Sequence, residues 1–244
     1  MEKLDFKEGV ILHIDKPYAM SSFGALAHIR YLLTKHEGFK VKVGHAGTLD
    51  PLATGVLTLC TGKKTKLIET LQAHDKEYVA TLQLGANTAS HDMEHPVDET
   101  FDTSGITRQQ IEEVLQHFVG DIEQVPPVYS AVCVNGKRAY QLSRKGHDFE
   151  IKAKTVHVEQ LELLHFDPEM MQLSLRVHCG KGTYIRSLAR DIGEQLGCGA
   201  YLTSLCRTRV GDVRVDDCLT LEQFPAWLNA HSPRMAHKKN ADIA

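Results

Sequence analysis

The stretch that most restricts how this chain can fold is an irregular segment of small residues, Gly44–Gly55. Three glycines and a proline within twelve residues are incompatible with a regular helix or strand. Hydrophobic flanks, Val41–Val43 and Val56–Cys60, place this segment between two expected strands. Asp50 precedes Pro51, which favours an extended backbone at Asp50. The loop can therefore present a carboxylate in a cleft between rigid strands, or the Asp-Pro pair makes an ordinary turn.

The composition indicates a globular chain from a reducing compartment. With 244 residues and 42% hydrophobic content, it can bury a sizeable core, and no linker divides it. No apolar run is long enough to cross a membrane, and Met1–Asp5 lacks the pattern of a signal peptide. The six cysteines form no CxxC pair, which argues against a zinc knuckle or a disulfide framework. We therefore expect reduced core cysteines and a cytoplasmic protein.

Charge is unevenly distributed along the sequence. The net charge is −3, yet residues 86–125 hold nine acidic side chains against the single basic Arg108. Residues 129–154 hold six basic side chains against two acidic ones. Such segregation is typical of a polyanion-binding face on a near-neutral protein, but a solvated hairpin would show it equally well.

Apolar periodicity predicts strands and helices without regular βα alternation. The clearest strand is Lys76–Leu84, in which Tyr78 and every second residue share one face. The clearest helix follows a capping box of Thr107 and Gln110, and we expect it to end at Gly120. Further strands are expected at 9–15, 155–166, 171–179 and 210–215, a hairpin turn at 135–136, and helices starting near 21, 62 and 183 and at 221–228. The pattern predicts an α+β fold with a mixed, largely antiparallel central sheet flanked by helices.

Two glycine- and lysine-containing segments could be mistaken for phosphate-binding loops. Gly62–Lys66 lacks the glycine five residues upstream and has Lys64 where a serine or threonine is needed. Gly180–Thr183 fails the same test. We therefore expect no nucleotide cofactor.

Several stretches together resemble one family, the TruB-type tRNA pseudouridine-55 synthases. The resemblance is strongest at Gly44–Gly55, at Lys76-Glu77-Tyr78 and at Gly180–Arg186. Supporting matches lie at 9–22 around Asp15-Lys16-Pro17, at 120–131 and at Leu205-Cys206-Arg207, so that the resemblance runs from about residue 9 to about 223. It implies the pseudouridine synthase fold and isomerisation of a uridine in the T-loop of tRNA, at position 55. It also implies that no metal or other cofactor takes part.

The resemblance also assigns roles to residues of this chain. It makes Asp50 the catalytic residue and Arg186 the cation paired with it. Tyr78 stacks on the flipped-out uracil and can accept the C5 proton, and His45 fills the space that the base leaves. Two further pocket-wall residues are Tyr184 and Leu205. By residue type alone, these side chains could equally be core, surface or solvated groups. An ionised carboxylate can begin such a reaction as a nucleophile at C6 or C1′, or as a base at C2′.

The resemblance further predicts how the chain is divided and what it binds. We expect a catalytic domain at 1–225, in which a basic insertion at 128–154 contacts the T-arm stem-loop of tRNA. Residues 226–244 form a short tail, and the C-terminal PUA domain of many members is lacking. In the acidic stretch after Leu84, only Asp92 matches the family pattern, and its role stays open. We expect a monomer with no membrane partner.

Three other functions compete with this prediction. A synthase of the same fold could act on another RNA, because the PUA domain is lacking. A catalytically idle RNA-binding or tRNA-folding protein could retain the cleft, but it has no need for Asp50, Tyr78 and Arg186 together. A metal-dependent nuclease is disfavoured, because the sequence shows no cluster of metal ligands.

Overall fold

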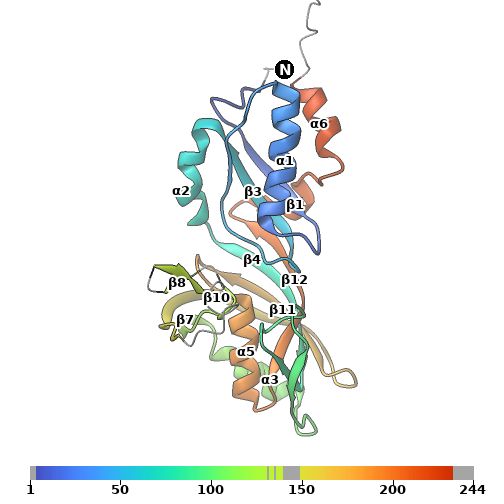
Figure 1. The fold of residues 1–244 in the computed structure, drawn as a ribbon. Helices are drawn as coiled ribbons and strands as arrows, with labels where there is room; N and C mark the ends of the chain where they lie inside the picture. The colour runs from blue at the N-terminus through green and yellow to red at the C-terminus, as the bar shows by residue number, and fades with distance from the viewer. Residues whose placement is uncertain (1–3, 131, 135, 140–148, 233–244) are drawn as a thin grey trace, which may run out of the picture.

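The computed structural model describes residues 4–130, 132–134, 136–139 and 149–232, and a nine-stranded sheet runs through it (Figure 1). In order across the sheet, the strands are β1 (Ile11–Lys16), β3 (Thr54–Thr61), β12 (Ala200–Val210), β4 (Lys76–Leu84), β11 (Gln172–Cys179), β10 (Lys154–Asp167) and β7 (Gly120–Gln124). Two short strands extend it: β2 (Val43–His45) pairs with β3, and β13 (Val213–Arg214) pairs with β12. Among the strands in the described residues, only β3 and β12 pair in parallel, and one isolated parallel bridge joins Ile14 to Leu219. The α+β prediction with a largely antiparallel sheet is confirmed.

The parallel pairing of β3 and β12 is short, and it joins two halves of the molecule. Its register places Cys206 opposite Thr54 and Arg207 opposite Gly55. Figure 1 shows α1, α2 and α6 at one end with β1 and β3, whereas α3 and α5 lie at the other end with β10. The long strands β4 and β12 run through both halves. The segment that follows β2 and precedes β3 therefore lies at the junction.

The first half is covered by helices whose ends follow from the sequence. Helix α1 (Ser22–Glu37) begins at the N-cap Ser21, whose hydroxyl accepts from the Gly24 N–H, and ends at Gly38 in the left-handed region. A 3₁₀ turn, η1 (Gly62–Leu67), leads into the short α2 (Ile68–Gln72). Helix α6 (Phe224–His231) packs on α1 and spans the boundary between residues 225 and 226, where we expected the domain to end and the tail to begin.

The second half is built on α3 and α5. Helix α3 (Arg108–Gln116) has the predicted Thr107–Gln110 capping box, but it ends four residues before Gly120. Helix α5 (Ile185–Leu196) packs on β12 and β4, and α3 packs on α5 and β10. Two small hairpins complete this half: β5 (Ala86–Thr88) with β6 (Val97–Thr100), and β8 (Cys133–Val134) with β9 (Lys137–Arg138). Arg144 and Lys145 of the basic insertion lie outside the described residues.

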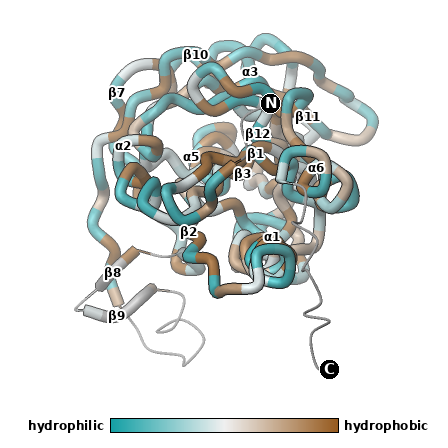
Figure 2. Tube along the Cα trace, turned by 90° about the horizontal axis from the view of Figure 1, so that it is seen from above, coloured by the Kyte–Doolittle hydropathy of each residue, from teal (hydrophilic) through white to brown (hydrophobic). Residues whose placement is uncertain are grey.

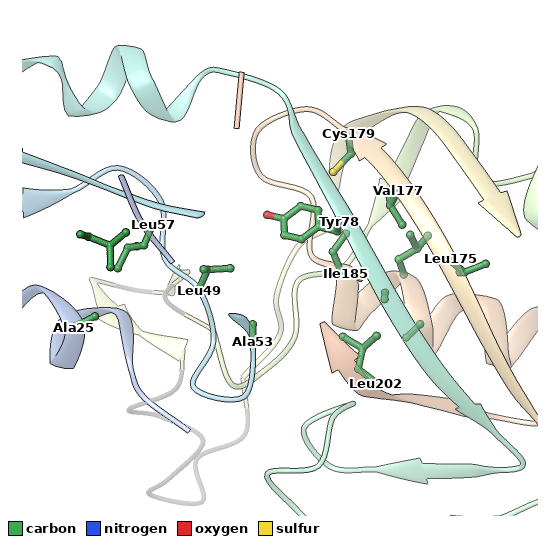
Figure 3. Packing of buried hydrophobic residues seen from close by; sticks show 14 of the residues in the cluster. Ala25, Leu49, Ala53, Leu57, Tyr78, Leu175, Val177, Cys179, Ile185 and Leu202 are labelled. Carbon is green, nitrogen blue, oxygen red and sulfur yellow. The ribbon is translucent and has the colours of Figure 1, made fainter. Parts of the chain in front are cut away.

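Hydrophobic side chains gather between the sheet and its helices. Figure 2 shows hydrophobic segments toward the middle of the view, around β1, β3 and β12. The buried cluster is continuous from Ala25 and Leu57 in one half to Leu175 and Ile185 in the other (Figure 3). In the described part of the chain, no helix is long and apolar enough to cross a membrane.

Two local predictions were wrong for physical reasons. The expected strand at 210–215 corresponds only to the end of β12 and the two residues of β13, whereas the eleven-residue β12 was missed. β12 holds the charged Arg207 at a buried position, because this part of the strand lines a polar site as well as the core. The second concerns the helix that starts near residue 21: helical spacing with Leu26 and Ile29 predicts Phe23 on its apolar face. In the structure Phe23 is 63% exposed, and Ala25 is buried instead.

Candidate active site

A cleft of about 630 Å³ opens where the two halves meet, and all six predicted site residues line it. They come from five different parts of the chain: His45 from β2, Asp50 from the loop after it, Tyr78 from β4, Tyr184 and Arg186 from the start of α5, and Leu205 from β12. The Asp50 loop and α5 are more than 130 residues apart in sequence, so the fold alone brings them together.

The loop that carries Asp50 is fixed by hydrogen bonds beneath it. The Ser22 hydroxyl donates to the Leu49 carbonyl at 2.8 Å and accepts from the Leu49 N–H at 2.7 Å. The buried ammonium of Lys16 donates to three carbonyls, one of them that of Pro51 at 3.2 Å. Burial lowers the pKa of Lys16 to about 8, against the attraction of nearby Asp50. The Asp50 side chain itself remains 33% exposed in the cleft.

Arg186 holds the Asp50 carboxylate through two parallel hydrogen bonds. Nε donates to Oδ2 at 2.9 Å and Nη2 donates to Oδ1 at 3.0 Å. The guanidinium also donates to the carbonyls of Ser90 and Tyr129. Arg186 is only 4% exposed, so it is not a surface arginine of α5. A bidentate, charge-assisted pair of this kind fixes the orientation of a carboxylate as well as its position.

A second buried carboxylate lies beside this pair. Asp92 Oδ2 is 3.7 Å from Arg186 Nε, and Asp92 Oδ1 accepts from the Ser90 hydroxyl and the Glu94 N–H. One guanidinium thus faces two carboxylates. Asp92, whose role the sequence left open, belongs structurally to the Asp50–Arg186 cluster.

Tyr78 projects from the buried face of β4 into the cleft. Figure 3 shows its hydroxyl directed away from β4, toward the side on which Leu49 and Ala53 lie. Burial raises the pKa of Tyr78, while the positive charge of Arg207 and a hydrogen bond from its guanidinium act in the opposite direction. The phenol therefore meets a fixed cation inside an otherwise apolar wall.

Arg207 connects Tyr78 with the Asp50 loop, although the sequence assigned it no role. It is 2% exposed and donates to the carbonyls of Val56 at 2.8 Å, Gly47 at 3.2 Å and Thr48 at 3.4 Å. Within the described residues it forms no ion pair with a carboxylate. Its only sequence signal is its place two residues after Leu205, in a stretch that carries the family resemblance.

The remaining predicted residues form the walls of the cleft. His45 lies in β2, and burial, together with the charge of Arg207, lowers its pKa. Tyr184 is the residue before α5, and its backbone N–H and carbonyl both bond to the buried Gln124 side chain, at 2.8 and 3.1 Å. Leu205 is partly buried beside them.

The described residues contain one group of side chains with metal-ligand spacing, and it lies outside this cleft. Asp75, Glu159 and His178 offer ligand atoms within 4.8 Å of one another. Both ring nitrogens of His178 already face partners, Glu159 at 3.2 Å and Arg209 at 3.1 Å. None of the six predicted site residues belongs to this group.

Two solved structures define the class of this fold. The chain matches one in "Crystal Structure of a Cbf5-Nop10-Gar1 Complex" with a TM-score of 0.69 and 31% identity, covering 92% of this chain and 55% of that one. It matches one in "Structure of H/ACA RNP bound to a substrate RNA containing 2'-deoxyuridine" with a TM-score of 0.66 and 26% identity, covering 95% and 57%. It thus spans little more than half of each solved chain. The fold is that of the pseudouridine synthases.

The chain belongs to the TruB family of pseudouridylate synthases, as its sequence indicated. The N-terminal domain of that family matches residues 33–185, and the tRNA pseudouridylate synthase B C-terminal domain matches residues 186–237. The tRNA pseudouridine synthase B of Phocaeicola vulgatus is 58% identical, over 93% of this chain and 96% of its own length. Pseudouridine synthases are isomerases, so the chain is an enzyme of that class.

Proposed function

We propose that the chain converts the uridine at position 55, in the T-loop of tRNA, to pseudouridine, with Asp50 as the catalytic residue and without a cofactor. The observation that carries this proposal is the Asp50 carboxylate, which Arg186 fixes through both oxygens and which opens into a cleft walled by Tyr78. The relatives that the chain matches are named tRNA pseudouridine synthase B, which supports tRNA as the substrate class.

The reaction breaks the C1′–N1 bond of uridine, turns the uracil and forms a C1′–C5 bond. The proton on C5 leaves and N1 gains one, so the product is an isomer and no co-reactant is consumed. Asp50 starts the sequence as a nucleophile at C6 or C1′, or as a base at C2′. Each route needs a fixed carboxylate beside the sugar and a base that is free to rotate, which the partly open position of Asp50 allows.

The other residues that line the cleft bind and position the flipped base. Removing a base from its stack costs about a few kcal/mol, and stacking on an aromatic ring returns about 1–3 kcal/mol. Tyr78 provides that ring, and its raised pKa keeps it a neutral stacking surface. To accept the C5 proton, the Tyr78 hydroxyl first releases its own proton to solvent, and Arg207 stabilises the phenolate that results. The C5 proton then returns Tyr78 to the neutral phenol. His45 occupies the vacated stack, while Tyr184 and Leu205 restrict where the uracil can turn.

Further parts of the chain bind the rest of the RNA. The basic segment 128–154 contacts phosphates of the T-arm, which position the RNA without reading its sequence. We take 1–225 as the catalytic domain and 226–244 as its tail, and place the enzyme in the cytoplasm as a monomer. One solved neighbour is described as bound to a substrate RNA, which supports RNA binding by this fold.

One assay tests the proposal. Purified full-length protein is incubated with an unmodified tRNA transcript in EDTA without nucleotide, and pseudouridine is mapped by carbodiimide-stalled primer extension. We expect product at the T-loop uridine. Asp50→Asn should lower the rate by at least about a thousandfold while tRNA binding persists. Asp212→Asn, an exposed aspartate outside the cleft lining, is the matched control.

Each other outcome has a defined meaning. Full activity of Asp50→Asn would overturn the catalytic assignment. Product at a uridine outside the T-loop would show a synthase with another RNA target. Binding of tRNA by the wild-type protein without any product would show an idle RNA-binding protein.

A further inference from the structure

We propose that Lys76 binds the backbone phosphate next to the flipped uridine, which deepens the proposed function and rests on it. Lys76 is the first residue of β4 and lines the same cleft as Asp50 and Tyr78. It is 7% exposed, yet it forms no ion pair within the part of the chain that the structure describes. A buried ammonium without an anion is costly unless other acceptors take all of its donors.

The hydrogen bonds of Lys76 leave one donor available. Nζ donates to the carbonyls of Gln72 at 2.7 Å and His74 at 2.5 Å. An ammonium has three donors, so the third has no partner among the described residues. The two bonds cap the end of α2, and a neutral amide side chain could do the same. The charge itself therefore needs a further explanation.

Lys16 shows what a purely structural buried lysine looks like in this protein. All three of its donors are used, on the carbonyls of Pro17, Met20 and Pro51, and it is absent from the lining of the cleft. Burial lowers the pKa of both Lys16 and Lys76 to about 8. The two lysines thus share the same desolvation, but only Lys76 keeps a free donor at the cleft.

The neighbours of Lys76 favour an anion. Arg207 and Lys181 both act on Lys76 as like charges, and all three residues line the cleft. The Asp75 carboxylate attracts Lys76 but is exposed and does not line the cleft. Repulsion among the three cations is relieved when an anion enters between them.

The spacing along β4 identifies this anion as a phosphodiester. Lys76 and Tyr78 lie two residues apart on the same face of the strand, roughly 7 Å along it. In a nucleotide whose base stacks on Tyr78, the phosphate lies one sugar away from the ring. Tyr78 and Lys76 would then hold the base and the phosphate of one nucleotide, which fixes the sugar between them near Asp50.

The test measures binding of a T-arm stem-loop RNA as a function of salt. All proteins carry Asp50→Asn, so that the RNA is not converted. Lys76→Met should weaken binding by about tenfold or more, and should reduce the slope of log K against log salt by about 0.7–0.9. Lys76→Arg should restore most of the slope. Lys63→Met, at an exposed lysine that pairs with Glu8 outside the cleft lining, should leave the slope unchanged.

A second measurement removes single charges from the RNA. The phosphates on the two sides of the target uridine are replaced one at a time by uncharged methylphosphonates. One replacement should weaken binding to the protein that retains Lys76, and the same replacement should have no further effect on Lys76→Met. An unchanged salt slope for Lys76→Met, or equal losses in both proteins, would show that Lys76 only caps α2. Binding without product by the wild-type protein would overturn the proposed function and not the phosphate site.

Discussion

The carbonyl oxygen of Arg207 occupies the space in which a Cβ of residue 55 would lie. A Cβ built on Gly55 would be 2.2 Å from that oxygen, and Gly55 has φ of +101°. The two residues face each other in the parallel pairing of β3 with β12. Glycine at position 55 therefore permits the backbone contact that sets the Asp50 loop against Arg207.

Gly55→Ala should be strongly destabilising. The methyl group meets main-chain atoms that cannot move without opening the β3–β12 pairing, and the left-handed φ adds strain. We expect a loss of roughly 2–4 kcal/mol in the free energy of unfolding, measured by urea denaturation. Gly38→Ala is the matched control, because its φ is +74° but nothing lies within 4 Å of its Cβ. That change should cost only about 1–2 kcal/mol. Equal losses would contradict the steric argument.

Gln124 should fix the position of the first turn of α5 and hence the orientation of the Arg186 side chain. Its side-chain amide pairs with the backbone N–H and carbonyl of Tyr184 as a strand would. Gln124→Ala removes both bonds from buried groups, and should cost about 2–4 kcal/mol of stability. It should also lower the rate of pseudouridine formation more than tRNA affinity. Gln109→Ala, on the exposed face of α3, should change stability by less than about 0.5 kcal/mol. A smaller loss for Gln124→Ala than for this control would contradict the assignment.

His91 should make the fold sensitive to mild acid. Burial, together with the charges of Arg190 and Arg186, lowers its pKa to about 4. Between pH 6.5 and 4 the unfolded chain therefore binds a proton that the folded chain does not. Stability from this residue is full above pH 6.5 and is lost as the pH falls toward 4, by roughly 2–3 kcal/mol.

The comparison for this prediction is His91→Asn. His91 has φ of +59°, a conformation that asparagine tolerates, so the variant keeps the backbone and removes the titrating group. The free energy of unfolding, measured from pH 7.5 to 4.5, should fall less steeply for the variant than for the wild-type protein. Parallel curves would show that His91 does not carry this dependence.

Local sequence patterns predicted much of the fold, but only where burial and periodicity coincide. Lys76–Leu84 alternates cleanly, so β4 was predicted with its buried face. β12 was missed because Arg207 is buried in it, and a buried cation interrupts the apolar pattern that identifies a strand. Helix α3 ends before Gly120 because residues 120–124 are needed as β7, which no local signal showed.

The candidate site was likewise predictable from the sequence only in part. The resemblance pointed to Asp50 and Arg186, and the fold places them within hydrogen-bond distance. The supporting charges, Arg207 and Lys16, could not be recognised from the sequence as site residues. Their partners are backbone carbonyls, and carbonyls have no sequence signature.

The pairing of β3 with β12 also sets the order in which the site can form during synthesis. The Asp50 loop leaves the ribosome early, but Arg186 and Arg207 follow more than 130 and 150 residues later. Until α5 has emerged, Asp50 lacks the guanidinium of Arg186, and until β12 has paired with β3, the carbonyls of the Asp50 loop lack Arg207 as their donor. A nascent chain therefore carries the Asp50 carboxylate before the guanidinium that orients it, and the complete site can form only after β12 has emerged.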